Sequence, residues 1–258
     1  MLVIGERING LFKDVAGAIQ KKDKKIIQDL AKIQVESGAH MLDVNTGPST
    51  MKPEQDIVWL VNAIQEVTDV PLVIDSPKVA VLEAGISAAK NKTMINSTTA
   101  QKEKLDSILP LAAKYNCSLI GLTMNEKGIP SDAAAKSELA LQIIAACMEQ
   151  GIPQENLFLD PLILPVNVTQ AQVKETLEVI KTIKTLSSPP PQVILGLSNV
   201  SQGTKNRNLI NAIYLVMSMA CGLDGAIMDP MDKELMNAMF TAEILLNKTI
   251  YCDSYLKA

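Results

Sequence analysis

The sequence is poor in aromatic side chains, in histidine and in paired cysteines, and each shortage argues against a class of function. Aromatic residues make up 3% of the 258 residues, too few to form the stacking platforms that bind single-stranded nucleic acid. The chain has one histidine, His40. Its four cysteines, Cys117, Cys147, Cys221 and Cys252, form no Cys-x-x-Cys pair. We therefore expect no protein-bound metal, and we expect the cysteines to be small buried thiols.

The chain also lacks an excess of positive charge and long apolar runs. The formal net charge is -4, whereas a nucleic-acid-binding protein needs a basic surface, so no nucleic-acid partner is expected. No apolar run approaches the roughly 20 residues of a membrane span. The chain goes directly into a strand pattern at Leu2 without the features of a signal peptide, which favours a cytoplasmic protein. Neither Gly-x-Gly-x-x-Gly nor Gly-x-x-x-x-Gly-Lys-[Ser/Thr] occurs, so a nucleotide phosphate site is not indicated.

Short apolar runs alternate with amphipathic segments along the whole chain. Strands are expected at 2–5, 41–45, 72–75, 93–96, 118–122, 157–160, 193–195 and 225–228. Helices are expected at 23–37, 53–67, 78–90, 102–115, 132–150, 169–186, 208–222 and 233–246. Continuous apolar strands are typical of parallel sheets that are covered on both faces. This pattern predicts an α/β fold, a (β/α)₈ TIM barrel, in a single domain over 1–258. A doubly wound open sheet is the alternative, but it usually has fewer strands at this length.

Polar residues gather where the expected strands end. They are Glu6, Arg7, Asn9, Asp43, Asn45, Asp75, Ser76, Asn96, Ser97, Thr123, Asn125, Asp160, Asn199 and Asp229. Active sites of barrels lie at the carboxyl ends of the strands. Any one of these residues could simply cap the next helix, and we favour that interpretation for Thr123 and Asp229. His40 precedes its strand and is expected to face away from the site.

Asp75, Asn96 and Asp160 together point to a ligand, because each ends its strand before the turn begins. A carboxylate accepts two parallel N–H bonds from an exocyclic amine and a ring N–H. A carboxamide offers both a donor and an acceptor to a neighbouring carbonyl. This set of side chains suits a fused heterocycle with a guanidine-like edge.

Motifs spread over nearly the whole chain resemble those of the methyltetrahydrofolate:corrinoid protein methyltransferases, a family of pterin-binding barrels. The matching stretches are Gly-Glu-Arg-Ile-Asn at 5–9, Asp-Val-Asn-Thr-Gly at 43–47, Asp-Ser at 75–76, Ile-Asn-Ser at 95–97, Asp-Pro-Leu at 160–162 and Gly-Leu-Ser-Asn-Val-Ser at 196–201. The resemblance implies that Asp75, Asn96 and Asp160 hold the pterin. It implies that Asn199 is the catalytic residue, which reaches the methyl-bearing N5. Weaker parallels assign pterin binding also to Gly196, Ser198, Gln202 and Arg207.

The resemblance further implies methyl transfer between tetrahydrofolate, or 5-methyltetrahydrofolate, and the cobalt of a corrinoid. Corrinoid domains use Asp-x-His-x-x-Gly, and the surroundings of His40 do not fit that motif. We therefore expect a separate corrinoid protein as a transient partner, and a homodimer as in the family. The direction of transfer stays open. Two alternatives are a dihydropteroate synthase-like enzyme, which would need a diphosphate site, and a folate-binding protein without catalysis.

Overall fold

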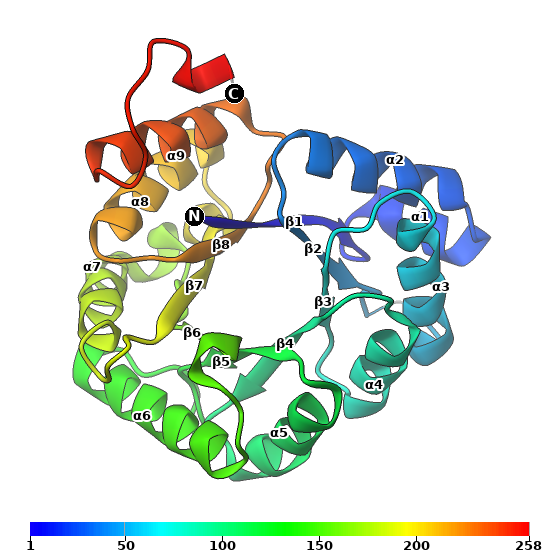
Figure 1. Ribbon diagram of the computed structural model, residues 1–258, viewed down its shortest axis with the longest axis horizontal. Helices are drawn as coiled ribbons and strands as arrows, with labels where there is room; N and C mark the ends of the chain where they lie inside the picture. Colours follow the sequence, from blue (N-terminus) through cyan, green and yellow to red (C-terminus); the bar gives the residue numbers. More distant parts are fainter. Residues whose placement is uncertain (49, 258) are drawn as a thin grey trace.

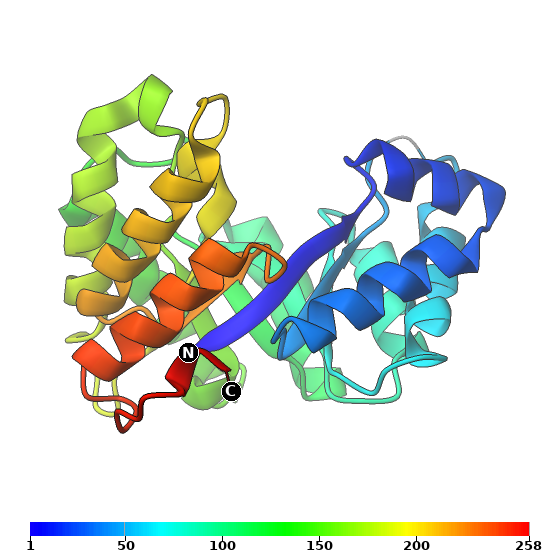
Figure 2. The same cartoon turned by 90° about the horizontal axis from the view of Figure 1, so that it is seen from above.

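In the computed structural model, which describes residues 1–48 and 50–257, the strands close into a parallel barrel in the order β1-β2-β3-β4-β5-β6-β7-β8. Figure 1 shows the strands at the centre and the helices around them as an outer ring. Figure 2 shows β1 running between α8 and α9 on one side and α1 and α2 on the other. The predicted TIM barrel is confirmed, and the open doubly wound sheet is excluded because β1 pairs with β8.

The elements follow one another with short connections. The strands are β1 (Leu2–Asn9), β2 (Met41–Asn45), β3 (Leu72–Asp75), β4 (Met94–Thr99), β5 (Ser118–Leu122), β6 (Leu157–Asp160), β7 (Gln192–Gly196) and β8 (Gly225–Met228). The α-helices are α1 (Lys13–Lys21), α2 (Lys24–Glu36), α3 (Pro53–Gln65), α4 (Val79–Ala88), α5 (Lys102–Tyr115), α6 (Ala133–Glu149), α7 (Val166–Ile183), α8 (Arg207–Ala220) and α9 (Lys233–Leu245). Short 3₁₀ helices are η1 (Gln154–Asn156), η2 (Leu197–Ser201) and η3 (Tyr255–Lys257).

Two apolar cores hold the barrel. The larger one lies between strands and helices, and the smaller one fills the barrel itself. The smaller core takes residues from every strand: Ile4, Met41, Val73, Met94, Ile120, Phe158 and Ile194, with Leu2, Leu122 and Ile227 packed against them. Successive side chains of a strand point to opposite faces, so the residue two positions further along each strand also points inward. This alternation decides what lies above the apolar core.

Three local differences from the sequence expectation affect the rim. The fourth strand continues to Thr99 rather than ending at residue 96, with a register shift against β5 between Asn96 and Thr98, so Asn96 does not end its strand. The first strand continues to Asn9 rather than ending at residue 5, with a register shift against β2 between Gly5 and Ile8. A helix not expected from the sequence, α1, follows it. This helix is only 9 residues long and contains Gly17, which weakens the helical signal. Val15, Ala18 and Ile19 nevertheless give it a buried face.

No helix in the part of the chain that the structure describes is both long and apolar enough to cross a membrane.

Candidate functional site

The strand ends form a polar layer directly above the apolar core of the barrel. Two residues beyond the core positions, the strands place Glu6, Asp43, Asp75, Asn96, Leu122, Asp160, Gly196 and Asp229. Every one of them lines a single cavity of about 790 Å³, a volume in the range of small-molecule sites. The alternation of side chains along the strands therefore builds the floor of the cavity from one residue of each strand. Six of the eight are carboxylic acids or amides.

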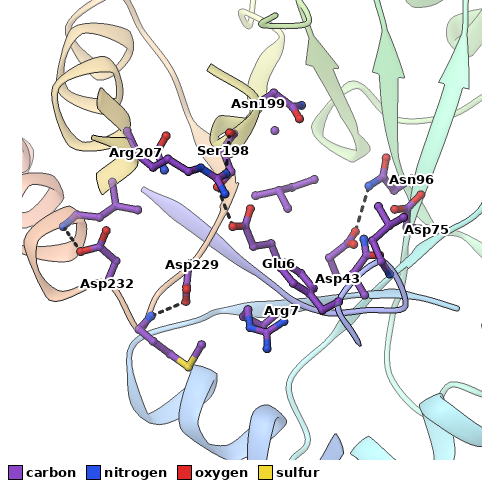
Figure 3. Close-up of a pocket in the computed structure, with 18 of the residues that line it drawn as sticks. Glu6, Arg7, Asp43, Asp75, Asn96, Ser198, Asn199, Arg207, Asp229 and Asp232 are labelled. Atoms are coloured by element: carbon purple, nitrogen blue, oxygen red, sulfur yellow. Dashed lines mark hydrogen bonds between the residues drawn. The ribbon is translucent and has the colours of Figure 1, made fainter. Parts of the chain in front are cut away.

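Two acids on neighbouring strands are each held by an asparagine amide. The Asn45 amide nitrogen donates to an Asp75 carboxylate oxygen across 2.7 Å. The Asn96 amide nitrogen donates to an Asp43 carboxylate oxygen across 3.0 Å, as Figure 3 shows. One N–H of Asn96 is used in this way, which fixes the orientation of the carboxamide and leaves its carbonyl oxygen and its second N–H for a ligand. Both acids retain further lone pairs for N–H donors.

Burial and mutual repulsion disfavour charge on this pair of acids. Burial, the neighbouring Asp75 charge and the Glu6 charge raise the pKa of Asp43 well above its ordinary value, against the hydrogen bond from Asn96. Burial also raises the pKa of Asp75, against the hydrogen bond from Asn45. A ligand edge that carries several N–H donors would compensate both effects.

Asp160, on β6, is fixed from two sides by backbone N–H groups. One carboxylate oxygen accepts from the Leu162 nitrogen at 2.7 Å, and the other accepts from the Gly196 nitrogen at 3.3 Å. Burial raises the pKa of Asp160 to about 6, while these two N–H groups and the nearby Lys136 ammonium oppose the rise. The carboxylate is therefore oriented before any ligand arrives.

Lys136 supports this strand end from beneath. Its side chain on α6 is 1% exposed, and its ammonium donates to the carbonyl oxygens of Pro161 at 2.7 Å and Leu162 at 2.9 Å. Burying a lysine ammonium carries a large desolvation cost. The hydrogen bonds to the two carbonyl oxygens offset this cost and fix the turn that follows Asp160. Lysine 136 lies in the apolar stripe of α6 with Ala140 and Ile143, and this misplaced charge was the sequence signal for its role.

The segment after β7 is held against β1 and α8. The Ser198 hydroxyl donates to a Glu6 carboxylate oxygen across 2.7 Å. Arg207 donates from Nε to the Ser201 hydroxyl at 3.1 Å and from a terminal nitrogen to the Ser198 carbonyl at 3.3 Å. These contacts fix η2, which carries Asn199 at the rim of the cavity.

Asn199 is exposed and its carboxamide makes no hydrogen bond within the described residues. A Cβ atom added to Gly196 would stand 3.1 Å from the Asn199 amide nitrogen. Glycine at 196 therefore leaves room for this amide. The Asn199 side chain is available to a ligand.

The structure brings the site residues predicted from the sequence together, with one exception. The cavity is lined by Asp75, Asn96, Asp160, Gly196, Ser198, Asn199 and Arg207. Gln202 is exposed and does not line it. The roles of all these residues stay predictions. The prediction omitted Glu6, Asp43 and Asp229 from the site, although all three are strand-end residues in the sequence.

The remaining reactive side chains lie elsewhere. His40 precedes β2 at the opposite end of the strand, and its Nδ1 accepts a hydrogen bond from the Val3 backbone at 3.0 Å. Cys117 and Cys147 are buried as expected, but Cys221 is partly exposed and Cys252 is exposed. The expectation of buried thiols was therefore wrong for Cys252, which lies in the connection between α9 and η3.

Comparison with known proteins adds independent observations. The family model of pterin-binding enzymes matches residues 13–229. Methylcorrinoid:tetrahydrofolate methyltransferase of Eubacterium limosum is 32% identical over the whole of this chain and 96% of its own length. Methionine synthase of Mycobacterium tuberculosis is 29% identical over 88% of this chain, but the match spans only 20% of that longer protein.

Solved structures share the fold. Dihydropteroate synthase of Yersinia pestis superimposes with a TM-score of 0.68 at 21% identity, covering 95% of this chain and 93% of that one. Dihydropteroate synthase of Xanthomonas albilineans, solved with 4-aminobenzoic acid, gives a TM-score of 0.72 at 18% identity, covering 95% and 92%. At such identities the likeness concerns the fold alone.

Proposed function

The chain belongs to the family of pterin-binding enzymes, and on this basis we propose that it transfers a methyl group between N5 of tetrahydrofolate and the cobalt of a corrinoid. The observation that carries the proposal is the cavity floor, where Asp75 on β3, Asn96 on β4 and Asp160 on β6 line one cavity. The full-length relative named as a methylcorrinoid:tetrahydrofolate methyltransferase supports the choice of reaction.

Pterin binding follows from the chemistry of these three side chains. The pterin presents an exocyclic amine and ring N–H groups, which suit carboxylates, next to a carbonyl. Asp75 and Asp160 accept the N–H groups, and Asn96 takes part through its unoccupied carbonyl oxygen. Each charge-assisted hydrogen bond contributes about 1.5–3 kcal/mol. Gly196, Ser198 and Arg207 line the same cavity toward the rim and extend the proposed binding surface.

The reaction needs stabilisation at N5. Breaking the bond between N5 and the methyl carbon leaves an electron pair on N5, so a proton or a hydrogen bond there lowers the barrier. Asn199 is proposed to supply this hydrogen bond from η2, where its amide is unoccupied. An interaction realised mainly in the transition state contributes about 2–4 kcal/mol.

The test is methyl transfer in both directions with a corrinoid as co-substrate. Purified protein with 5-methyltetrahydrofolate and Co(I) cobalamin should convert the cobalt to methyl-Co(III), followed by stopped-flow absorbance. The opposite reaction starts from methylcobalamin and tetrahydrofolate. If the protein binds folate but transfers no methyl group in either direction, it is a folate-binding protein without this activity. The ratio of the two rates with candidate corrinoid proteins gives the physiological direction.

The partner and the assembly are part of the proposal. A corrinoid protein is proposed to dock transiently over the cavity, because the chain lacks a corrinoid-binding motif around His40. A homodimer in the cytoplasm, without nucleic-acid partners, is proposed as well. Leu209, Ile213 and Met217 form an apolar stripe on α8 and are 59%, 55% and 46% exposed. Sedimentation analysis of the protein and of Ile213→Glu tests whether this stripe joins two copies.

Dihydropteroate synthase activity is the less favoured alternative. That reaction displaces a diphosphate and calls for cations at the last strand ends. Here β7 leads into Leu197, Ser198 and Asn199, and β8 leads into Asp229 and Asp232, which carry no positive charge. An assay for dihydropteroate formation separates the two activities.

A further inference from the structure

Glu6 is an acid of the cavity floor that pterin binding does not use. It points inward from β1 and accepts the Ser198 hydroxyl hydrogen bond at 2.7 Å. Figure 3 shows its carboxyl between Asp43 and Asn96 on one side and Asp229 on the other. It lines the same cavity as Asn199. Because Ser198 precedes Asn199 in the chain, its hydrogen bond holds the Glu6 carboxyl close to the proposed reaction centre.

Burial, modified by the neighbouring charges, raises the pKa of Glu6 toward neutral pH. Burial raises its pKa to about 7, the Asp229 charge adds to the rise, and the Ser198 hydroxyl opposes it. The guanidinium groups of Arg207 and Arg7 also lower it. Asp43 faces Glu6 from β2, and the two acids repel each other. Glu6 can therefore exist in either protonation state under physiological conditions, as general acids and bases require.

In the proposed reaction, N5 gains one proton in one direction and loses it in the other. When the cobalt(I) electron pair forms the bond to the methyl carbon, the electron pair of the broken C–N bond stays on N5. That nitrogen then takes up one proton and becomes N–H. In the opposite direction N5–H loses this proton as nitrogen forms its bond to the methyl group. The carboxamide of Asn199 can donate a hydrogen bond to N5, but it is not an acid of suitable strength.

Other acids of the cavity are less suited to this exchange. Asp43 and Asp75 are engaged by the amides of Asn96 and Asn45. Asp160 accepts two backbone N–H groups and must stay ionised to accept from the pterin. Asp229 accepts the Met231 backbone N–H at 3.0 Å, as a turn-capping residue does.

We propose that Glu6 is the proton-exchanging residue of the reaction: its carboxylic acid supplies the proton that N5 gains when the methyl group leaves, and its carboxylate removes that proton in the opposite direction. The inference rests on the proposed methyl transfer. Glu6 is then a catalytic residue with a role distinct from pterin binding. Ser198 tunes its acidity and holds it beside Asn199.

The first part of the test separates binding from transfer in Glu6→Gln. Glutamine still accepts the Ser198 hydroxyl, so the Kd for 5-methyltetrahydrofolate, measured by calorimetry, should stay within about 3-fold of wild type. The stopped-flow rate of methyl transfer to Co(I) cobalamin should fall about 10²–10⁴-fold. Glu6→Asp keeps the acid at a shorter reach and should lose less. A Glu6→Gln variant that transfers at the wild-type rate overturns the inference.

The second part uses the pH profile, which a merely structural role would not move. In wild type, transfer to cobalt should fall as pH rises through about 7, because Glu6 loses its proton. Asp229→Asn removes a neighbouring negative charge and should move this fall in rate to lower pH. Ser198→Ala removes a hydrogen bond to the carboxylate and should move it to higher pH. Glu6→Gln should show no such fall in rate near pH 7.

The outcomes separate the two proposals. The role of Glu6 is overturned if the fall in transfer rate near pH 7 persists in Glu6→Gln. It is also overturned if this fall does not move in opposite directions in Asp229→Asn and Ser198→Ala. Either result leaves the proposed methyl transfer intact. Wild-type protein that transfers no methyl group in either direction overturns both.

Discussion

The Asn96 side-chain amide donates a hydrogen bond to the Asp43 carboxylate across 3.0 Å, linking β4 to β2 within the floor of the cavity. This bond fixes which end of the Asn96 carboxamide faces a ligand. Asp43→Ala leaves the amide free to rotate and should weaken folate binding about 10-fold, the cost of roughly one net hydrogen bond. Asp43→Asn keeps an acceptor oxygen for Asn96 and should bind nearly as wild type. Calorimetric titration with 5-methyltetrahydrofolate measures both variants, and equal losses would contradict this role of the pair.

Asn199 should matter more for turnover than for binding. Asn199→Ala removes a hydrogen bond that is proposed to strengthen as N5 loses its methyl group. Turnover should fall by roughly 10²–10³-fold, while the folate Kd should change by only a few-fold. Comparison of kcat with the Kd from titration tests this, and wild-type values of both would show that the assigned role is wrong.

Substitution of Gly196 tests the position of the Asn199 amide without removing it. The Gly196 φ of -73° is one that alanine adopts without strain, but the added Cβ would stand 3.1 Å from the Asn199 nitrogen. Gly196→Ala should therefore displace the amide and lower kcat about 10-fold with a smaller change in KM. Gly17→Ala is the matched control, because a Cβ there meets nothing within 4 Å. That control should keep full activity and gain about 0.5–1 kcal/mol in stability.

Lys136 should shift the pH at which folate binding is lost. Folate affinity should fall as pH is lowered through about 6, where Asp160 takes up a proton and ceases to be a double acceptor. Lys136→Met removes a positive charge that lowers the pKa of Asp160, so the loss should begin at higher pH. Lys181→Met, on the exposed part of α7, is the control and should not shift the profile. An unchanged midpoint in Lys136→Met would show that the lysine only packs.

The raised pKa of Glu6 should also make the free energy of unfolding depend on pH. Its pKa is raised in the folded protein from 4.5 to about 7, so the folded state holds a proton that the unfolded state has released between these values. The unfolding free energy contributed by Glu6 therefore falls as pH rises from about 4.5 to 7. Glu6→Gln removes this loss and should gain stability relative to wild type, reaching on the order of 1–3 kcal/mol above pH 7. Urea unfolding at pH 5 and pH 8 measures the difference, and a difference that is the same at both would contradict the raised pKa.

Strand and helix positions were largely predictable from the sequence, because apolar runs and helical periodicity are local signals. Asp75, Asn96 and Asp160 were identified in the same way, as polar residues at the expected ends of apolar strands, although β4 continues past Asn96 to Thr99. Glu6 lay beyond the expected end of its strand, and only the continuation of β1 to Asn9 shows that it points inward.

Other features depend on contacts between distant residues. Asn96 and Asp43 are 53 positions apart in the chain, and Lys136 reaches the Pro161 carbonyl across 25 positions. The position of Lys136 in the apolar stripe of α6 indicates burial, but no local pattern shows which carbonyl oxygens its ammonium reaches. These pairings arise from closure of the barrel, which brings successive strand ends and their helices together.

A crystal structure of the protein with 5-methyltetrahydrofolate tests the central claim most directly. The pterin should lie in the cavity with its N–H edge on Asp75 and Asp160 and with Asn96 beside it. Its N5 should face Asn199 and Glu6. A folate bound outside this cavity, or no binding at all, would contradict the account.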